Sequence, residues 1–254
     1  MALPTTHPTT EVYYPDTDGL PVAESDFQLG PLIYALDALR AYFQGRDDVY
    51  VAGDLFLYYE EGNPSAVVAP DVFVVLGAPN HARASYMLWR EPKAPDFVLE
   101  ITSQSTQVQD QGTKRERYAL LGVREYFLYD PTRDYLEPML QGLRLVGNVY
   151  RPIPSTTSPE GTLVLRSDVL GLELRLEDET LRLYDPTTGQ RLLSYQEAEQ
   201  ARREAEQARR EAEQGRQAAE ARAQTAEARV AELEARLRAL RAMPPTPPPP
   251  SADS

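Results

Sequence analysis

Hydrophobic residues recur with two different periods along the first three quarters of the chain. Between positions 31 and 43 they stand three or four apart, which predicts a helix with Pro31 in its first turn and Gly45 just after its end. A second helix is predicted over about 113–121, ended by Gly122. Short runs rich in β-branched and aromatic residues predict strands at 49–51, 55–59, 67–68, 72–75, 97–101 and 123–129. Such apolar strands, separated by helices, predict an α/β fold with a mixed central sheet covered on both faces.

Composition divides the chain into five segments. The first is rich in proline and threonine, with one short strand expected from Glu11 to Tyr14; the third is mostly β; the fourth is a heptad repeat; and the last resembles a polyproline tail. The expected segments are an N-terminal arm (1–23), an α/β core (24–140), a β-rich hairpin extension (141–194), a coiled coil (195–243) and a disordered tail (244–254).

The heptad repeat predicts a long helix that associates with a second copy. Alanine or leucine stands at every seventh position from Ala198 to Leu240, and Ala223, Val230 and Leu237 add a second apolar position in the later heptads. Arginines occupy that second position earlier, so the first half is equally compatible with a lone helix held by Glu–Arg pairs. From this pattern we expect a homo-oligomer, a dimer, formed through residues 195–243.

Composition excludes several classes of chemistry. The chain of 254 residues contains no cysteine and only two histidines, which removes thiolate metal sites and cysteine nucleophiles and nearly removes histidine-based triads. No apolar run reaches the length of a membrane span, and we expect a cytoplasmic protein without membrane contact. The net charge of −13 disfavours nucleic-acid binding in general. It is still compatible with a local basic groove or with acids that bind a divalent metal.

The candidate chemistry lies between Pro70 and Lys114. Asp71 and Asp96 each follow a proline and lead directly into an apolar strand. Glu100 lies inside the second of these strands, on the face shared by Asp96, where burial is expected. Together such acids can form an oxygen-only site for Mg²⁺ or Mn²⁺. The alternatives are ordinary turn aspartates and, for Glu100, a salt bridge to an arginine.

Lysine is rare in this chain. Only Lys93 and Lys114 occur among twenty-six basic residues. Lys114 begins the second predicted helix, where an ammonium can fold back over the end of the preceding strand; the alternative is a solvated surface lysine.

These residues resemble a known family. The motif residues are Ala94–Ser103, Asp110, Gly112, Lys114-Arg115, Tyr118, Gly122-Val123 and Glu125–Pro131, with looser matches at Pro70–Val72 and Ala23–Asp26. They are similar to the Uma-type family of putative restriction endonucleases, within the PD-(D/E)XK nuclease superfamily. The resemblance covers about residues 20–190 and implies a restriction-endonuclease-like fold, a mixed central sheet flanked by helices.

The resemblance also implies roles for individual residues. Asp71 and Glu100 would be the two acids that hold Mg²⁺ or Mn²⁺, and Glu24 would complete the set from a helix. The superfamily lysine should stand two residues after Glu100, where this chain has Thr102, and Lys114 takes its place. The implied activity is metal-dependent endonuclease cleavage of phosphodiester bonds, with DNA as the expected substrate, and Lys114→Ala should abolish cleavage while leaving the fold intact.

Two other functions remain open from the sequence. The chain can be a non-catalytic interaction protein, in which a nuclease fold serves as a scaffold and oligomerises through its coiled coil. A sugar- or nucleotide-processing hydrolase with paired carboxylates is weaker, because it gives Lys114 no task. Convergence of Asp71, Glu100 and Lys114 in space would favour the nuclease.

Overall fold

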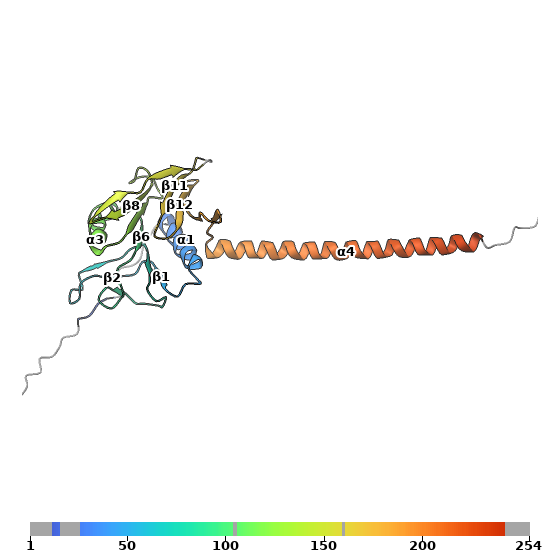
Figure 1. Ribbon diagram of the computed structural model, residues 1–254, viewed down its shortest axis with the longest axis horizontal. Coiled ribbons are helices and arrows are strands. Elements are labelled where there is room, and N and C mark those ends of the chain that lie inside the picture. The colour runs from blue at the N-terminus through green and yellow to red at the C-terminus, as the bar shows by residue number, and fades with distance from the viewer. Residues whose placement is uncertain (1–11, 16–25, 104–105, 159–160, 242–254) are drawn as a thin grey trace, which may run out of the picture. The chain divides into compact units, whose positions relative to one another are not determined.

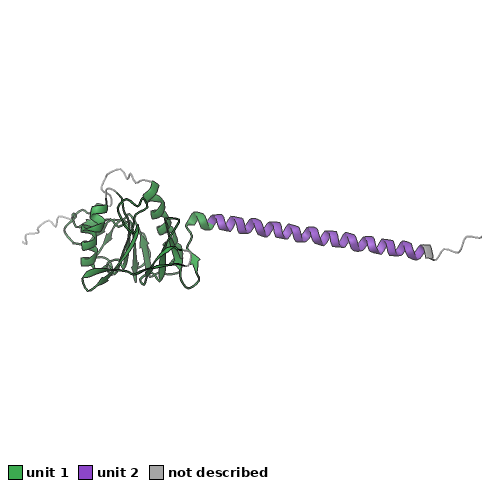
Figure 2. Cartoon of the chain, turned by 90° about the horizontal axis from the view of Figure 1, so that it is seen from above, with its two compact units in different colours: residues 1–198 green, residues 199–254 purple. Residues whose placement is uncertain are grey.

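The computed structural model describes residues 12–15, 26–103, 106–158 and 161–241 (Figure 1). Its contacts divide the chain into two compact units, residues 1–198 and 199–254, coloured separately in Figure 2. In the part of the chain that the structure describes, no helix combines the length and hydropathy that a membrane span requires.

A six-stranded mixed sheet forms the centre of the first unit. Its spatial order is β1–β4–β6–β7–β8–β9, and β6 and β7 are its parallel neighbours, whereas all the other neighbours are antiparallel. The strands are β1 (Val49–Ala52), β4 (Val72–Leu76), β6 (Phe97–Ile101), β7 (Glu125–Tyr129), β8 (Leu140–Val146) and β9 (Val149–Pro152). This arrangement confirms the predicted fold class.

One face of the central sheet packs on α1 (Asp26–Tyr42) and on a second, antiparallel sheet. Phe97, Leu99 and Ile101 of β6 point to this face, as their alternation predicts. The second sheet comprises β10 (Ser155–Thr157), β11 (Leu163–Ser167), β12 (Leu172–Glu177), β13 (Thr180–Asp185) and β14 (Gln190–Arg191). The segment after residue 140 therefore supplies both the edge of the central sheet and this second sheet.

The opposite face of the central sheet is covered by α3 (Thr113–Leu121) and a small sheet. Figure 1 shows β6 between α1 and α3. The small sheet contains β2 (Leu57–Tyr58), β3 (Val67–Val68) and β5 (Tyr86–Met87). Val98 and Glu100 of β6 point to this face, so the face that carries the candidate acid lies beneath α3.

Local structure departs from the sequence pattern at three places. Residues 12–15 form no strand; instead Tyr14 packs its ring on Tyr58 and Trp89, with ring centroids 5.2 and 5.1 Å away. The apolar run at 55–59 forms a regular strand only at β2, although the Tyr59 N–H still donates to the carbonyl oxygen of Ala66 and the Phe56 carbonyl oxygen accepts from the Tyr86 N–H. The first helix begins at Asp26, five residues earlier than predicted, with Pro31 inside it.

The polar stretch before α3 contains a short helix that the sequence pattern did not predict. This helix, α2 (Gln107–Gln111), ends at Gly112, which separates it from α3. A Cβ atom at Gly112 would lie 2.9 Å from the carbonyl oxygen of Val108 in α2, so glycine permits the tight backbone turn between the end of α2 and the start of α3.

The heptad segment is a continuous helix, α4 (Tyr195–Arg241). Its start is a capping box, in which the Glu197 N–H donates to Ser194 Oγ and the Ser194 N–H donates to Glu197 Oε2. Ion pairs between glutamate and arginine three or four residues apart recur along the helix. In the single chain its apolar residues Val230, Leu233 and Leu237 are all at least half exposed.

Candidate active site

Glu100 is a fully buried carboxylate at the end of β6. Its exposed fraction is 0%, which confirms the burial expected from the strand alternation. The hydroxyl of Tyr118 donates to Oε1 at 2.5 Å, and the ammonium of Lys114 donates to Oε2 at 2.9 Å. Both oxygens are therefore held by donors from α3, and the carboxylate has one fixed orientation.

Lys114 lies between two buried acids. Its Nζ is 2.9 Å from Glu100 Oε2 and 3.1 Å from Asp110 Oδ1, and Asp110 is also 0% exposed. The Asp110 contact is an ion pair without hydrogen-bond geometry, since both oxygens of Asp110 lack a hydrogen-bond partner. Asp110 is anchored through its backbone, because the hydroxyl of Tyr126 donates to its carbonyl oxygen at 2.8 Å.

Asp71 reaches the same region from the neighbouring strand. The antiparallel register pairs Val72 of β4 with Leu99 of β6, so the preceding residue, Asp71, lies opposite Glu100. The backbone N–H of Asp71 is 3.4 Å from Glu100 Oε2, and the N–H of Ile101 donates to Asp71 Oδ2 at 2.6 Å. A Cβ atom at Gly53, which follows β1, would collide with the carbonyl oxygen of Asp71. Only a glycine at position 53 therefore allows the backbone to pack this closely against Asp71.

The acids perturb one another strongly. Burial, followed by the charge of Glu100, raises the pKa of Asp71 well above its usual range. Burial also raises the pKa of Glu100, partly offset by Lys114. Burial alone would lower the pKa of Lys114, but Glu100, Asp110 and Asp71 raise it, and the ammonium stays charged. Clusters of perturbed pKa values with buried charge partners are typical of functional sites.

Asp96 belongs to a different, structural contact at the other end of β6. Its Oδ1 accepts hydrogen bonds from Lys93 Nζ at 2.5 Å and from Arg124 Nε at 2.9 Å, and its Oδ2 accepts from the Leu76 N–H at 2.8 Å. Two cations and a backbone donor thus satisfy this buried acid, and it links the start of β6 to β4 and to the turn before β7.

The remaining candidates have mixed outcomes. Glu24 lies outside the described residues. Thr102, where the resemblance placed the superfamily lysine, is 1% exposed, and its hydroxyl oxygen is buried without a hydrogen-bond partner. It follows Glu100 by two residues and so shares the strand face that the acids occupy.

Two residues join the site without a role assigned from the sequence. Asp110 and Tyr118 were recognisable only as motif positions, although Asp110 stands four residues before Lys114, the spacing at which helical side chains meet. Tyr118 follows Lys114 by the same interval. Burial, and then the charge of Glu100, raises the pKa of Tyr118 well above its usual range, so its hydroxyl stays a donor.

The residues present suit a hard divalent cation in chemistry and charge. Three carboxylates (Asp71, Glu100 and Asp110) and one ammonium leave a formal excess of two negative charges when all are ionised. Asp110 Oδ2 is a buried oxygen without a partner, and Asp71 Oδ1 accepts no hydrogen bond from the described residues. Nevertheless, no group of three or more acids or histidines within the described ranges is already arranged as a metal cage. Mg²⁺ sites often use only one or two carboxylates, with water and substrate phosphate as the other ligands.

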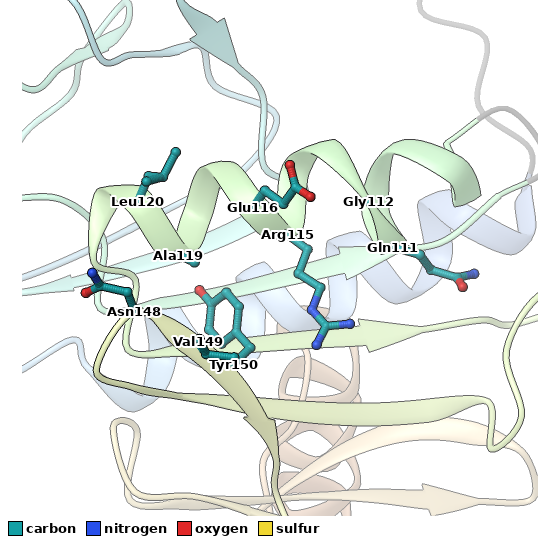
Figure 3. A pocket seen from close by; sticks show the side chains of 9 residues that line it. All are labelled: Gln111, Gly112, Arg115, Glu116, Ala119, Leu120, Asn148, Val149 and Tyr150. Carbon is teal, nitrogen blue, oxygen red and sulfur yellow. The ribbon is translucent and has the colours of Figure 1, made fainter.

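A pocket of about 590 Å³ opens beside Lys114. Its walls come from the β2–β3 region and from α2 and α3, and they include Phe56, Tyr59, Gln109 and Arg117. A second pocket, of about 460 Å³, lies on the other side of α3 against β9, with Arg115 and Tyr150 on its wall (Figure 3). Of these two pockets only the first is lined by Lys114, and the three acids behind that lysine do not line it.

The α/β fold brings buried acids and a lysine together beside a pocket, as the resemblance to a nuclease family predicted. The comparison with protein families agrees. The family model Uma2, described as a putative restriction endonuclease, matches residues 24–177, which is more than half of the chain. The chain therefore belongs to the Uma2 family, as its motif residues predicted.

Comparison with solved structures finds a crystal structure described as a putative nuclease belonging to DUF820, from Anabaena variabilis. It is similar with a TM-score of 0.40 and 12% sequence identity, over 55% of this chain and 75% of that chain. No curated protein matches the sequence.

Proposed function

We propose that this protein is a divalent-metal-dependent endonuclease that hydrolyses phosphodiester bonds in DNA. The observation that carries the proposal is the ammonium of Lys114, held at 2.9 Å from Glu100 and 3.1 Å from Asp110, with Asp71 on the adjacent strand. Membership of the Uma2 family supports the same reaction class. A scaffold has no need for three buried acids around one lysine, because burying such charges is costly.

Each residue has a defined task in this proposal. Asp71 and Glu100 would hold Mg²⁺ or Mn²⁺, with Asp110 as a further oxygen donor beside them. The ion, when bound, supplies charge neutralisation at the scissile phosphate and a water of lowered pKa. Tyr118 fixes the orientation of Glu100 through its hydrogen bond to Oε1. Lys114 places a compact positive charge where negative charge develops on the phosphate oxygens.

The test combines metal binding with cleavage. Calorimetric titration of Mn²⁺ or Mg²⁺ into the full chain is expected to show binding that is lost in an Asp71→Asn, Glu100→Gln double variant. These replacements keep the side-chain size, so that Ile101 and Tyr118 still find an acceptor oxygen. Glu116→Gln, which removes one exposed acid from α3, is the matched control and should bind normally.

Cleavage of single-stranded and duplex DNA is measured on the same three proteins. Cleavage by the wild type and by Glu116→Gln, but not by the double variant, would support the proposal. A folded wild type that cleaves neither substrate with either metal would refute it. The non-catalytic scaffold would then be the favoured function.

We further propose that the protein dimerises through α4, in the cytoplasm. The apolar residues Val230, Leu233 and Leu237 are exposed in the single chain, and their spacing is that of a coiled-coil interface. Light scattering of the full chain should give a dimer, and removal of residues 195–254 should give a monomer. A full chain that is monomeric at micromolar concentration would rule out this assembly.

A further inference from the structure

The pocket beside Lys114 has a wall made of aromatic rings and an arginine. Phe56 and Tyr59 flank β2, and both are partly exposed. The guanidinium of Arg117 lies over the ring of Tyr59, with its Cζ atom 4.3 Å from the ring centroid. Arg117 therefore has a fixed position without using its N–H donors for an acid, and no ion pair to it occurs among the residues that the structure describes.

These groups match the parts of a single nucleotide. Aromatic rings stack on nucleobases of any sequence, a guanidinium binds phosphate oxygens, and the side-chain amide of Gln109 can pair with a base edge. The volume of about 590 Å³ falls in the range of pockets that enclose small organic ligands, about 300–1,000 Å³. Lys114 forms part of the same wall, which would bring the nucleotide's phosphate next to the candidate catalytic cluster.

The same features disfavour an intact duplex. A base offers its face to an aromatic ring only when it is unstacked from its neighbours, as in single strands, loops and flipped nucleotides. Duplex binding usually depends on a basic surface that contacts many phosphates, whereas this chain has a net charge of −13.

We infer that the pocket lined by Phe56, Tyr59 and Arg117 is a subsite for an unpaired nucleotide, so that the substrate is single-stranded at the point of cleavage. This inference rests on the proposed nuclease function. It adds the class of substrate and assigns Tyr59 and Arg117 to substrate binding. Tyr59 provides the stacking surface, and Arg117 contacts the phosphate backbone.

Binding is measured with the full chain by fluorescence anisotropy in EDTA, so that no cleavage occurs. The probes are a short fluorescein-labelled oligothymidylate and a duplex of the same length. The variants are Tyr59→Leu, which keeps an apolar side chain packed on the core, and Arg117→Gln, which is on the surface of α3 and carries less risk of unfolding. Arg115→Gln is the matched control: it removes the same charge from the same helix, but at the second pocket beside Tyr150 (Figure 3).

The wild type is expected to bind the single strand more tightly than the duplex. Because one base stacked on an aromatic ring contributes an amount equivalent to about 5- to 150-fold in affinity, Tyr59→Leu should weaken single-strand binding within that range. Arg117→Gln should weaken it as well, while Arg115→Gln should leave it close to that of the wild type. Thermal melting of each variant checks that it is folded.

The outcomes separate this inference from the proposed function. Equal affinity for single strand and duplex, or equal losses in Arg117→Gln and Arg115→Gln, overturns the subsite, even if the wild type cleaves DNA with Mn²⁺. Selective losses in Tyr59→Leu and Arg117→Gln without any cleavage support the subsite and overturn the nuclease. A folded wild type that neither binds nor cleaves overturns both.

Discussion

The two lysines of this chain have different surroundings, which makes a matched test of the buried cluster possible. The Lys114 side chain is 14% exposed and contacts Glu100 and Asp110, both 0% exposed. The Lys93 side chain is 44% exposed, and its partner Asp96 is also bound by Arg124. We predict that Lys114→Met strongly lowers the free energy of unfolding and that Lys93→Met scarcely changes it.

The magnitude follows from what each substitution leaves unpaired. Breaking a buried ion pair by removing one partner costs about 3–5 kcal/mol. A stranded carboxylate can instead take up a proton, which for a glutamate of reference pKa about 4.3 costs about 3.7 kcal/mol at pH 7. We therefore expect Lys114→Met to lose about 3–4 kcal/mol. Lys93→Met should lose less than about 1 kcal/mol, since its exposed pair is screened by water and Asp96 keeps two other donors.

Urea unfolding in EDTA, followed by the fluorescence of Trp89, measures these differences in the first unit. Trp89 is the only tryptophan of the chain and packs against Tyr14. The double variant Lys114→Met, Glu100→Gln should recover part of the lost stability, because one of the two stranded charges is gone. Equal midpoints for Lys114→Met and Lys93→Met would show that the cluster is not held together as argued.

The contacts of Lys114 also change how its role in cleavage must be tested. The sequence alone suggested that Lys114→Ala would leave the fold intact. With a loss of about 3–4 kcal/mol against a total stability of about 5–15 kcal/mol for a typical domain, the variant stays folded but is weakened. Activity of any Lys114 variant therefore has to be compared at a temperature where its folded fraction has been measured.

Three further predictions concern the framework of the first unit and the assembly through α4. Asp130 accepts five hydrogen bonds from the loop after β7. Burial alone would raise the pKa of Asp130, but these hydrogen bonds lower it overall. Their stabilisation of the folded state is therefore present above the unfolded-state pKa of about 3.9 and is lost as the pH falls through the lower folded-state pKa. Asp130→Asn should cost about 3 kcal/mol in urea unfolding at pH 7 and flatten the acid side of the stability profile; an unchanged profile would contradict this assignment. Gly53→Ala should displace Asp71 and lower both the melting temperature and Mn²⁺ affinity, whereas a variant with normal melting and affinity would show that the turn can adjust. Leu233→Glu in α4 should abolish dimerisation in light scattering without altering the melting of the first unit, and a persistent dimer would place the interface elsewhere.

The sequence predicted β1, β4, β6 and β7 of the central sheet because these strands have an unambiguous pattern, but it assigned the region of β8 and β9 to a separate extension. Alternation along Phe97–Ile101 placed Glu100 on the face opposite Leu99, and the structure buries it there. The short helix α2 was missed because Gln107–Gln111 offers no apolar periodicity; only Val108 is apolar, and it is 79% exposed. Without α2, Asp110 could not be placed at the end of a helix next to the start of α3, and its contact with Lys114 was not predicted.

The distinction between Asp71 and Asp96 illustrates a second limit. Both follow a proline and precede a buried strand, so their local sequences favour the same role. Their positions are decided by the direction in which β4 pairs with β6. The antiparallel register, Val72 with Leu99, brings Asp71 next to Glu100 and leaves Asp96 at the far end, where Lys93 and Arg124 neutralise it.

A parallel pairing of the same two strands would have produced a different site. Asp71 and Asp96 would then lie at one edge of the sheet, and Glu100 would be left at the other edge with Lys114. Strand direction depends on the long-range packing of the whole sheet, which no local motif encodes. The family resemblance predicted that Asp71 and Glu100 lie together, because proteins that share a family motif also share the fold that positions its residues. The sequence pattern indicates which acids are candidates, and the sheet register determines which of them lie close together.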